Sequence, residues 1–409
     1  MLVNQAFRYE LKPNNKQISL LVKHCGVARF AWNWALARRI ELYKTREGKD
    51  RFTSAISQHK ELNALKQSDF PWMYDVSKCA PQSALQDLDK AYSNMIRRIK
   101  NHEYEIGRPK FKKKGVHDSF RLTGAVKVKD NLIQLPRIGD IRTKEPTHKF
   151  AGNILSATVS READRWYCSL CVEVNRPEPQ PIQGDIVGID LGINCFATIS
   201  DGKTITEIHS PKPLRKNIKK LKKLHRELSR KKKGSKNKRE AQLRLARLYR
   251  KIKNIRQDFL AKETSRLAKT KSVIIIEDLN ISGMVKNHHL ARSIGDEGWG
   301  DYGRMLGYKT HWYGSRLLKI PRFYPSSKRC NHCGVVNKEL KLSDRTWVCL
   351  NCGAVNERDP NAAHNIRECG IGILNTESLS EFQACGVDVR LPKREAIGCE
   401  AGIKHICYK

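Results

Sequence analysis

Three positions in the sequence place acidic side chains at the ends of predicted elements. Asp190 ends the β-branched strand of "DIVGID", and Glu277 and Asp278 end the strand of "SVIIIED". Asp359 precedes a proline in "NERDPNAAHNI", which is typical of a helix N-cap with proline at the first helical position. Taken singly, each acid is explained as well by a turn, a surface charge or a cap. Together they predict carboxylates that hold two Mg²⁺ ions, or Mn²⁺ in their place, and hydrolyse a phosphodiester.

The two adjacent acids cannot both serve such a site. Neighbouring residues of a strand point to opposite faces, so at most one of Glu277 and Asp278 faces a site shared with Asp190. The local pattern leaves this choice open. A bound cation would explain Asp190, because a buried carboxylate without a partner costs several kcal/mol or takes up a proton.

Four cysteines have the spacing of a structural zinc site. "CNHC" and "CLNC" are two C-x₂-C pairs separated by 15 residues, and a glycine follows each pair. Four thiolates close a tetrahedral site and leave no open position for catalysis. One structural Zn²⁺ is therefore predicted at Cys330, Cys333, Cys349 and Cys352. A third pair, Cys168 and Cys171, lies in an apolar strand without such glycines and is interpreted as buried strand cysteines.

The composition points to a polyanionic partner. The 409 residues include 78 Lys and Arg against 42 Asp and Glu, a net charge of +36. Such an excess favours binding to nucleic acid in quantity, and an anionic membrane is the lesser alternative because no basic helix has a bulky apolar face. No apolar run reaches the roughly 18 residues of a membrane span, and the N-terminus lacks signal-peptide features. Thirteen scattered cysteines, an odd number, favour a reducing cytoplasm.

The elements that must position these residues follow from periodicity. Near-alternation over 3–11 predicts a strand, after which Pro13 and Asn14 break the strand and offer a helix cap. Apolar spacing then predicts helices over 16–45 and 82–100. Residues 117–175 alternate as a small β-domain, in which "READR" forms a hairpin turn and which the N-terminal strand could complete. The Pro-rich segment at 175–185 predicts a domain boundary.

Residues 214–254 combine 19 Lys or Arg with only two Glu. Two apolar stripes at helical spacing, separated by "KKKGSKNK", predict a helical hairpin with one apolar seam and a basic outer face. Because a solvated charged face normally mixes both signs, this surface is predicted to contact phosphates. After about residue 370 no periodicity is sustained, and 373–409 is expected to be a disordered tail.

The order and spacing of these motifs closely resemble the TnpB (OrfB) family of transposon-encoded RNA-guided nucleases, relatives of type V CRISPR effectors. The resemblance rests on "GIDLGINCFATISDG", "VIIIEDLNISGM", "CNHCG" with "CLNCG", and "RDPNAAHNI". "YELKPNNKQISLLVKHCGVARFAWNWAL" and "GRPKFKKK" extend it toward the N-terminus, so that it covers the chain to about residue 370.

The resemblance implies a multi-domain α+β fold. Its nuclease part would be a RuvC-like domain with an RNase H-like α/β fold, interrupted by a zinc ribbon, and its N-terminal part an oligonucleotide-binding-like β-barrel wedge domain interrupted by a helical recognition lobe. The implied bounds are 184–325 and 354–372 for the nuclease, with the basic hairpin at 212–270, 326–353 for the ribbon, 1–15 and 106–178 for the wedge, and 16–105 for the lobe.

Residue roles follow from the same resemblance. The three metal-binding acids of the family fall on Asp190, Glu277 and Asp359, so the resemblance selects Glu277 over Asp278. In the recognition lobe it makes Lys78 and Gln82 candidate contacts to the short DNA motif. The candidate nucleic-acid contacts of the basic hairpin are Lys219, Lys223, Arg230, Lys231 and Arg247.

The resemblance implies an RNA-guided endonuclease that cuts double-stranded DNA beside a transposon-adjacent motif. Its partners would be a guide RNA from the transposon end and the target DNA, with no membrane, and the chain would act as a monomer with RNA in a prokaryotic cytoplasm, near the nucleoid. Two alternatives stay open. One is an RNA-guided DNA-binding repressor, against which the three intact acids argue. The other is a guide-free RuvC-like nuclease or transposase, which leaves the large basic surplus unexplained.

Overall fold

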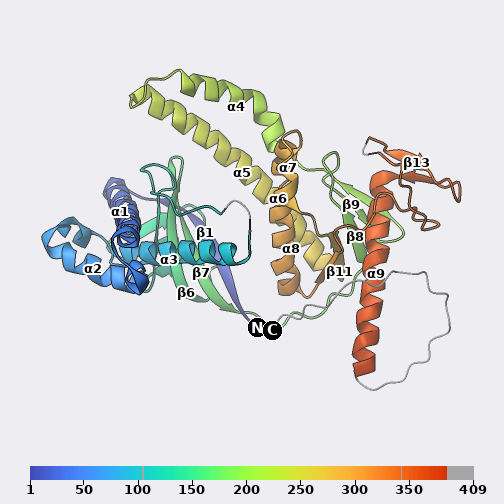
Figure 1. Ribbon diagram of the computed structural model, residues 1–409, viewed down its shortest axis with the longest axis horizontal. Helices are drawn as coiled ribbons and strands as arrows, with labels where there is room; N and C mark the ends of the chain where they lie inside the picture. The colour runs from blue at the N-terminus through green and yellow to red at the C-terminus, as the bar shows by residue number, and fades with distance from the viewer. Residues whose placement is uncertain (104–105, 342, 385–409) are drawn as a thin grey trace. The chain divides into compact units, whose positions relative to one another are not determined.

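The contacts of the chain divide it into two compact units (Figure 1). The computed structural model describes residues 1–103, 106–341 and 343–384. The first unit contains Met1–Glu178 and Pro213–Ile255, and the second contains Pro179–Lys212 and the residues from Arg256 onward. In the described part of the chain, no helix has both the length and the apolar character required to cross a bilayer.

The first unit is built on a seven-stranded antiparallel sheet with the order β2-β6-β7-β1-β5-β4-β3. The N-terminal strand β1 lies at its centre, because it pairs with β7 from Leu2↔Asn175 to Leu11↔Trp166 and with β5 at its other edge. The predicted strand at 3–11 and the predicted hairpin are confirmed, with a turn at 163–164. The strands are β1 (Leu2–Lys12), β2 (Ser119–Leu122), β3 (Lys127–Lys129), β4 (Leu132–Leu135), β5 (Gly139–Thr143), β6 (Asn153–Glu162) and β7 (Arg165–Asn175).

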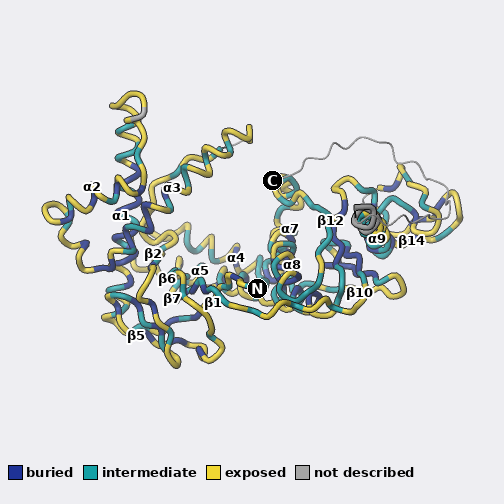
Figure 2. The backbone as a smooth tube through the Cα atoms, turned by 90° about the horizontal axis from the view of Figure 1, so that it is seen from below, coloured by how far each residue is buried: buried dark blue, intermediate teal, exposed yellow. Residues whose placement is uncertain are grey.

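Three α-helices between β1 and β2 share one core with this sheet (Figure 2). The Asn14 side chain accepts a hydrogen bond from the Gln17 backbone N–H, and the Gln17 side chain accepts one from Asn14, a capping box that starts the first helix where the sequence predicts it. The His24 ring joins that helix to the segment before the third, because one nitrogen contacts the Leu20 carbonyl at 2.8 Å and the other accepts from the Ser77 N–H. The helices are α1 (Asn15–Thr45), α2 (Ala55–Ser68) and α3 (Cys79–Lys100), with 3₁₀ turns at Gly48–Arg51 and Pro71–Asp75.

The basic hairpin consists of α4 (Pro213–Ser229) and α5 (Lys236–Thr270), and its single apolar seam is confirmed. The seam is formed by Leu221, Leu245, Leu248 and Ile252, with Leu214, Leu224 and Leu228 packed against them. Residues Pro213–Ile255 are grouped with the first unit, whereas the resemblance placed 212–270 within the nuclease part. Ion pairs join α5 to the β6–β7 turn of that unit, in which Arg250 bonds to Asp164 and Lys253 to Glu162, both at 2.8 Å.

The second unit is built on a five-stranded sheet with the order β10-β9-β8-β11-β12. Strands β8, β11 and β12 run parallel, while β9 and β10 are antiparallel to their neighbours. Parallel strands of the same sheet bring their carboxyl ends to one edge. The strands are β8 (Ile186–Asp190), β9 (Ala197–Ser200), β10 (Ile205–Ile208), β11 (Val273–Glu277) and β12 (Arg316–Ile320).

Helices cover both faces of this sheet. On one face, Val187, Ile189, Ile274 and Ile276 pack with α8 (Trp299–Tyr313) and the C-terminal part of α5. On the other face, Ile275 and Ile320 pack with Ile366 of α9 (Arg358–Ala384). Two short helices, α6 (Ile281–Met284) and α7 (Ala291–Glu297), connect β11 to α8.

Helix α9 approaches β8 closely enough to require glycine at position 188. A Cβ atom at Gly188 would lie 2.3 Å from the Ala363 carbonyl oxygen and 2.5 Å from the Arg367 backbone nitrogen. Backbone atoms cannot move aside as a side chain can. The close approach therefore fixes the start of α9, and with it Asp359, against the carboxyl end of β8.

Replacing Gly188 with Ala is expected to lower the free energy of unfolding of the second unit by about 3 kcal/mol, because the helix must move away from the sheet. Gly26→Ala in α1 is the matched control, since a Cβ atom there meets nothing within 4 Å. That control should instead stabilise the first unit by about 1 kcal/mol. Calorimetric unfolding of both variants measures the difference, and an unchanged second unit in Gly188→Ala would contradict this packing.

The C-terminal helix corrects two expectations. Residues 373–384 belong to α9 and do not form a disordered tail, because Cys369 and Ile373 continue the apolar face of Ile366 and Arg316 bonds to Glu377 at 2.5 Å. The end of the expected tail, 385–409, lies outside the described residues. In addition, α9 begins at Arg358, so Asp359 lies in the first helical turn rather than at the N-cap.

The zinc-ribbon segment before α9 contains the two-stranded sheet of β13 (Thr346–Val348) and β14 (Val355–Glu357).

Candidate functional site

The structure brings Asp190, Glu277 and Asp359 to the same edge of the second sheet. Strand β8 ends at Asp190 and β11 ends at Glu277, and the parallel register pairs Ile189 with Ile276 immediately before them. Alternation along each strand turns both carboxylates toward the face that α9 covers, as it does Gly188 and Ile275. Asp359, in the first turn of α9, lies near enough for its charge to act on Asp190, although the three carboxylates do not all lie within 4.8 Å of one another.

The negative charge of this group is only partly compensated within the protein, by Arg345 near Asp359 and by Arg358 near Asp190. Burial, followed by repulsion from Glu277 and Asp359, raises the pKa of Asp190 to about 8. Burial also raises the pKa of Glu277. Carboxylates that are costly to ionise together are the oxygen ligands that a divalent cation neutralises, so the donor set fits Mg²⁺.

Asp278, the neighbour of Glu277, has a different environment. Its carboxylate accepts from Arg322 at 2.5 Å and from Lys319 at 3.3 Å, and hydrogen bonds from these cations lower its pKa. Asp278 is therefore already paired with positive charge, from Lys319 of β12 and from Arg322, which follows that strand. Asp359 lies 3.5 Å from Arg345 of the ribbon.

Sequence reasoning missed the polar groups that orient these acids. The Ser326 hydroxyl donates to Glu277 Oε1 at 2.5 Å, and the Ser326 carbonyl accepts from Asn365 of α9 at 2.8 Å. Asn361 bonds to the backbone of Arg329 at 2.8 Å. The one sequence signal was the pair of serines that lies two residues before the first C-x₂-C pair.

Replacing Ser326 with Ala is expected to weaken metal-dependent activity about 10- to 100-fold, since groups that orient metal ligands have effects of that size. The loss should take the form of a higher Mg²⁺ concentration at half-maximal cleavage, because the side chain orients Glu277. Ser327→Ala is the matched control. If the Mg²⁺ dependence of Ser326→Ala equals that of the unsubstituted protein, this orienting role is wrong.

The four predicted cysteines gather as a zinc site requires. All four Sγ atoms lie within 4.8 Å of one another, with Cys330 to Cys352 at 3.8 Å and Cys333 to Cys349 at 3.5 Å. Tetrahedral zinc with Zn–S bonds of about 2.3 Å separates its sulfurs by about 3.8 Å. Hydrogen bonds, led by that of the Val335 backbone N–H, lower the pKa of Cys333, whereas burial and the neighbouring thiols raise the pKa of Cys352.

The backbone around the cysteines repeats in both turns. The N–H of Gly334 donates to the Cys330 carbonyl at 2.9 Å, and that of Gly353 donates to the Cys349 carbonyl at 2.8 Å. Both glycines have positive φ, 79° and 70°, as the sequence predicts for such turns. The residues therefore fit one structural Zn²⁺.

Two further sets of cysteines in the described part of the chain do not fit a metal. Cys168 is buried in β7 and its burial raises its pKa to about 12, in agreement with a strand cysteine. Cys195, Glu207 and His209 also offer ligand atoms within 4.8 Å of one another. The Cys195 thiol, however, donates to the Ile208 carbonyl at 3.2 Å, and burial raises its pKa. Because a metal binds the thiolate, we assign no metal to this group.

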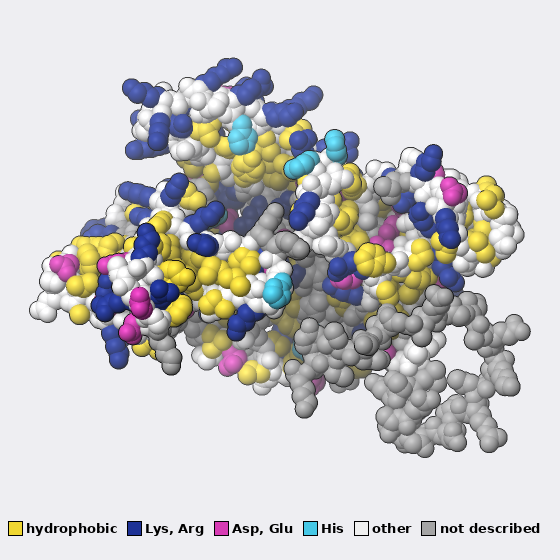
Figure 3. Space-filling view, viewed as in Figure 1, with side chains coloured by type: hydrophobic (Ala, Val, Ile, Leu, Met, Phe, Trp, Pro, Cys, Tyr) yellow, Lys and Arg dark blue, Asp and Glu magenta, His cyan; other side chains and the backbone are white. Residues whose placement is uncertain are grey.

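The basic hairpin presents its Lys and Arg side chains on the outer surface (Figure 3). All five candidate contacts on it, Lys219, Lys223, Arg230, Lys231 and Arg247, are exposed. Arg247 is also paired with Asp164, at 2.9 Å and 3.0 Å. In the first unit, Lys78 lies exposed at the N-cap of α3, and Gln82, in its first turn, is half-buried. The nucleic-acid contacts stay predictions.

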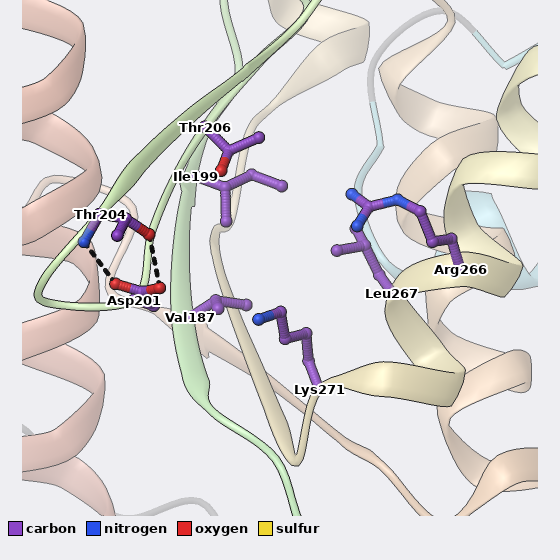
Figure 4. A pocket seen from close by; sticks show the side chains of 8 residues that line it. All are labelled: Val187, Ile199, Asp201, Thr204, Thr206, Arg266, Leu267 and Lys271. Atoms are coloured by element: carbon purple, nitrogen blue, oxygen red, sulfur yellow. Dashed lines mark hydrogen bonds between the residues drawn. The ribbon is translucent and has the colours of Figure 1, made fainter.

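A small cavity of the second unit is distinct from the acidic group (Figure 4). It lies beside Val187 at the start of β8, whereas Asp190 ends that strand. Asp201 on its rim accepts hydrogen bonds from the Thr204 hydroxyl and backbone N–H, both at 2.6 Å, and these bonds hold its pKa below its usual value. The cavity therefore adds nothing to the acidic site.

Three family models match the chain. One described as a probable transposase, OrfB_IS605, matches residues 169–288, and a Cas12f1-like TNB domain matches 299–366. A helix-turn-helix domain matches 1–49, although these residues here form β1, one continuous helix α1 and the beginning of a 3₁₀ turn. The Cas12f1-like match contains the four-cysteine cluster and Asp359.

Curated relatives match over nearly the whole length. A "Putative RNA-guided DNA endonuclease" of Streptomyces pristinaespiralis is 35% identical over 96% of this chain and 94% of its own. "Putative RNA-guided DNA endonuclease InsQ" of Escherichia coli is 33% identical over 90% of this chain and 93% of its own. A Cas12f1 chain, solved as a complex with sgRNA and target DNA, shares the fold with a TM-score of 0.52 at 13% identity, covering 90% of this chain and 99% of that one. The multi-domain α+β fold is thus that of the Cas12f effectors, and the chain belongs to the TnpB (OrfB) family.

Proposed function

We propose that this chain is an RNA-guided DNA endonuclease that cleaves double-stranded DNA by metal-dependent phosphodiester hydrolysis. The observation that carries the proposal is the convergence of Asp190, Glu277 and Asp359 at the carboxyl edge of two parallel strands. It occurs in a chain related over 96% of its length to a protein named as such an endonuclease.

In the proposed mechanism, Asp190, Glu277 and Asp359 hold two Mg²⁺ ions, or Mn²⁺. When bound, these ions supply Lewis-acid stabilisation of charge on the attacking and leaving oxygens. Asp190 and Glu277 act as paired oxygen ligands on adjacent strands, and Ser326 holds the Glu277 carboxylate in position. Asp359 contributes from the start of α9, which the ribbon and Gly188 hold in place.

We further propose that the second unit contains a RuvC-like nuclease domain. Its strand order, β10-β9-β8-β11-β12, with a parallel half and an antiparallel half, supports an RNase H-like fold. The sheet of the first unit would be the wedge domain, with α1 to α3 as the recognition lobe that contains Lys78 and Gln82. The basic hairpin would contact the phosphates of the guide RNA or the DNA.

The proposed partners are a guide RNA derived from the transposon end and a double-stranded target beside a short adjacent motif. Base pairing would select the sequence, while the protein would recognise the motif and the shape of the heteroduplex. A monomer bound to one RNA, acting in the prokaryotic cytoplasm at the nucleoid, completes the proposal.

Expression of the chain with its native flanking DNA, followed by sequencing of the co-purified RNA, tests the function. The same complex is then incubated with Mg²⁺ and a library of matched targets with randomised flanks. We expect one discrete RNA and cleavage beside one short motif. A discrete RNA with binding but no cleavage would instead favour a repressor. Cleavage of branched or single-stranded DNA without a defined RNA would favour a guide-free nuclease.

A further inference from the structure

Phe323 is a large apolar side chain held almost entirely in water. It is 93% exposed, although it follows β12 by only three residues. It stands at the corner of a turn closed by the Tyr324 N–H, which donates to the Pro321 carbonyl at 3.1 Å. An exposed Phe forgoes about 2 kcal/mol of burial, so its position calls for an explanation.

The turn that carries Phe323 is anchored on both sides. Before it, Arg322 donates to the Asp278 carbonyl at 3.0 Å and to its carboxylate at 2.5 Å. After it, Tyr324 packs against the cluster of Ile275, Ile320 and Ile366, and Ser326 bonds to Glu277. The ring is thus exposed on a segment whose backbone is fixed.

The turn emerges beside the acidic group. Strands β11 and β12 run parallel with Glu277 opposite Ile320, so the segment after β12 leaves the sheet at the edge where β8 and β11 end. Ser326, three residues after Phe323, touches Glu277 itself. A DNA strand that reached the acidic group from this side would pass the turn that carries Phe323.

We propose that Phe323 is a stacking platform for an unpaired base of the DNA strand to be cut, an inference that rests on the proposed endonuclease function. An aromatic face binds any unpaired base, because every base has a π-face, and such contacts contribute about 1–3 kcal/mol each. Bases inside a duplex are already stacked, so the ring selects a single strand. A phosphodiester that lies at the acids would then have its neighbouring base held in place by the Phe323 ring.

The test compares Phe323→Ala, Phe323→Leu and Phe323→Trp in the complete guide complex. We expect Phe323→Ala and Phe323→Leu to slow Mg²⁺-dependent cleavage of a matched target about 5- to 150-fold, the rate equivalent of 1–3 kcal/mol. Phe323→Trp should retain activity, because it restores a stacking face. Leu350→Ala, a change at a side chain that is 97% exposed, is the control and should cleave normally.

A second readout separates stacking from a structural role. 2-Aminopurine is placed at successive positions of the cut strand, and its fluorescence should be quenched at one position by the unsubstituted complex and not by Phe323→Ala. An abasic site at that position should slow the unsubstituted complex as much as the substitution does. Melting temperature and target binding without added Mg²⁺ should be unchanged in every variant.

The outcomes distinguish this inference from the proposed function. If the unsubstituted complex cleaves and Phe323→Ala cleaves equally fast, the inference is wrong and the proposed function stands. The inference is also wrong if Phe323→Trp slows cleavage as much as Phe323→Leu does. It is wrong as well if the control Leu350→Ala slows cleavage to the same extent. If the unsubstituted complex with its guide does not cleave at all, the proposed function fails first, and the inference with it.

Discussion

Replacing Asp190 with Asn is expected to reduce guide-dependent DNA cleavage at least about a thousand-fold while leaving guide-dependent DNA binding nearly intact. The carboxylate is a predicted metal ligand, and metal stabilisation of a phosphoryl transition state is worth several kcal/mol. Binding should persist, because the predicted RNA and DNA contacts lie elsewhere on the chain. Cleavage of a labelled matched target with Mg²⁺ and retention of the same target without added Mg²⁺ measure the two effects.

Asp185→Asn is the matched control, because Asp185 lies at the opposite end of the same strand segment and pairs with Lys271 at 2.7 Å. It should cleave at nearly the normal rate. Loss of DNA binding in Asp190→Asn would mean that Asp190 has a structural role, and retained cleavage would remove it from the site.

The raised pKa of Asp190 leads to a prediction about how stability depends on pH. The pKa of Asp190 is raised from 3.8 to about 8, so the folded state retains its proton more strongly than the unfolded chain. Without added Mg²⁺, the second unit should therefore lose stability as the pH rises from about 4 through about 8, as the carboxylate is forced to ionise. Asp190→Asn stays neutral and should melt at a higher temperature than the unsubstituted protein at pH 8. Added Mg²⁺ should stabilise only the unsubstituted protein.

Replacing Cys330 and Cys333 with Ser is expected to release the zinc, unfold the ribbon and slow cleavage roughly 100-fold. The free energy of zinc binding to four thiolates is also what drives the ribbon to fold, so the ribbon cannot stay folded without the metal. The ribbon in turn holds the start of α9, since Asn361 accepts from the Asn331 N–H at 2.9 Å and bonds to the Arg329 carbonyl. A displacement of Asp359 by about 1 Å is enough for a loss of that size.

Zinc content by mass spectrometry and cleavage of a matched target measure both parts of this prediction. Cys171→Ser in β7 is the control, because it alters the other C-x₂-C pair and should keep one zinc per chain. Normal cleavage by a zinc-free Cys330→Ser and Cys333→Ser protein would contradict the positioning role of the ribbon. A variant that keeps its zinc would contradict the assignment of the ligands.

Local patterns were sufficient for much of the fold. The capping box at Asn14, the hairpin of β6 and β7 and the seam of α4 and α5 depend on residues close in sequence, and each appears where periodicity and turn chemistry predict it. The C-terminal part of α9 was missed because its local pattern is too weak to predict a helix. Its apolar residues, Ile366, Cys369 and Ile373, are few, and only the facing strands β11 and β12 make them a helix surface.

For the site, the sequence by itself determined the ligand chemistry. It identified the four cysteines, Asp190 and Asp359, and it narrowed the third acid to Glu277 or Asp278, because residue type and spacing are local properties. Residue type and spacing left that choice open, the family resemblance selected Glu277, and the tertiary structure supplies a physical reason for it. The parallel pairing of β8 with β11 and the close packing of α9 at Gly188 turn Glu277 inward, while Asp278 pairs with Arg322. These contacts join segments distant in the chain, and alternation within one strand cannot specify which face another element will cover.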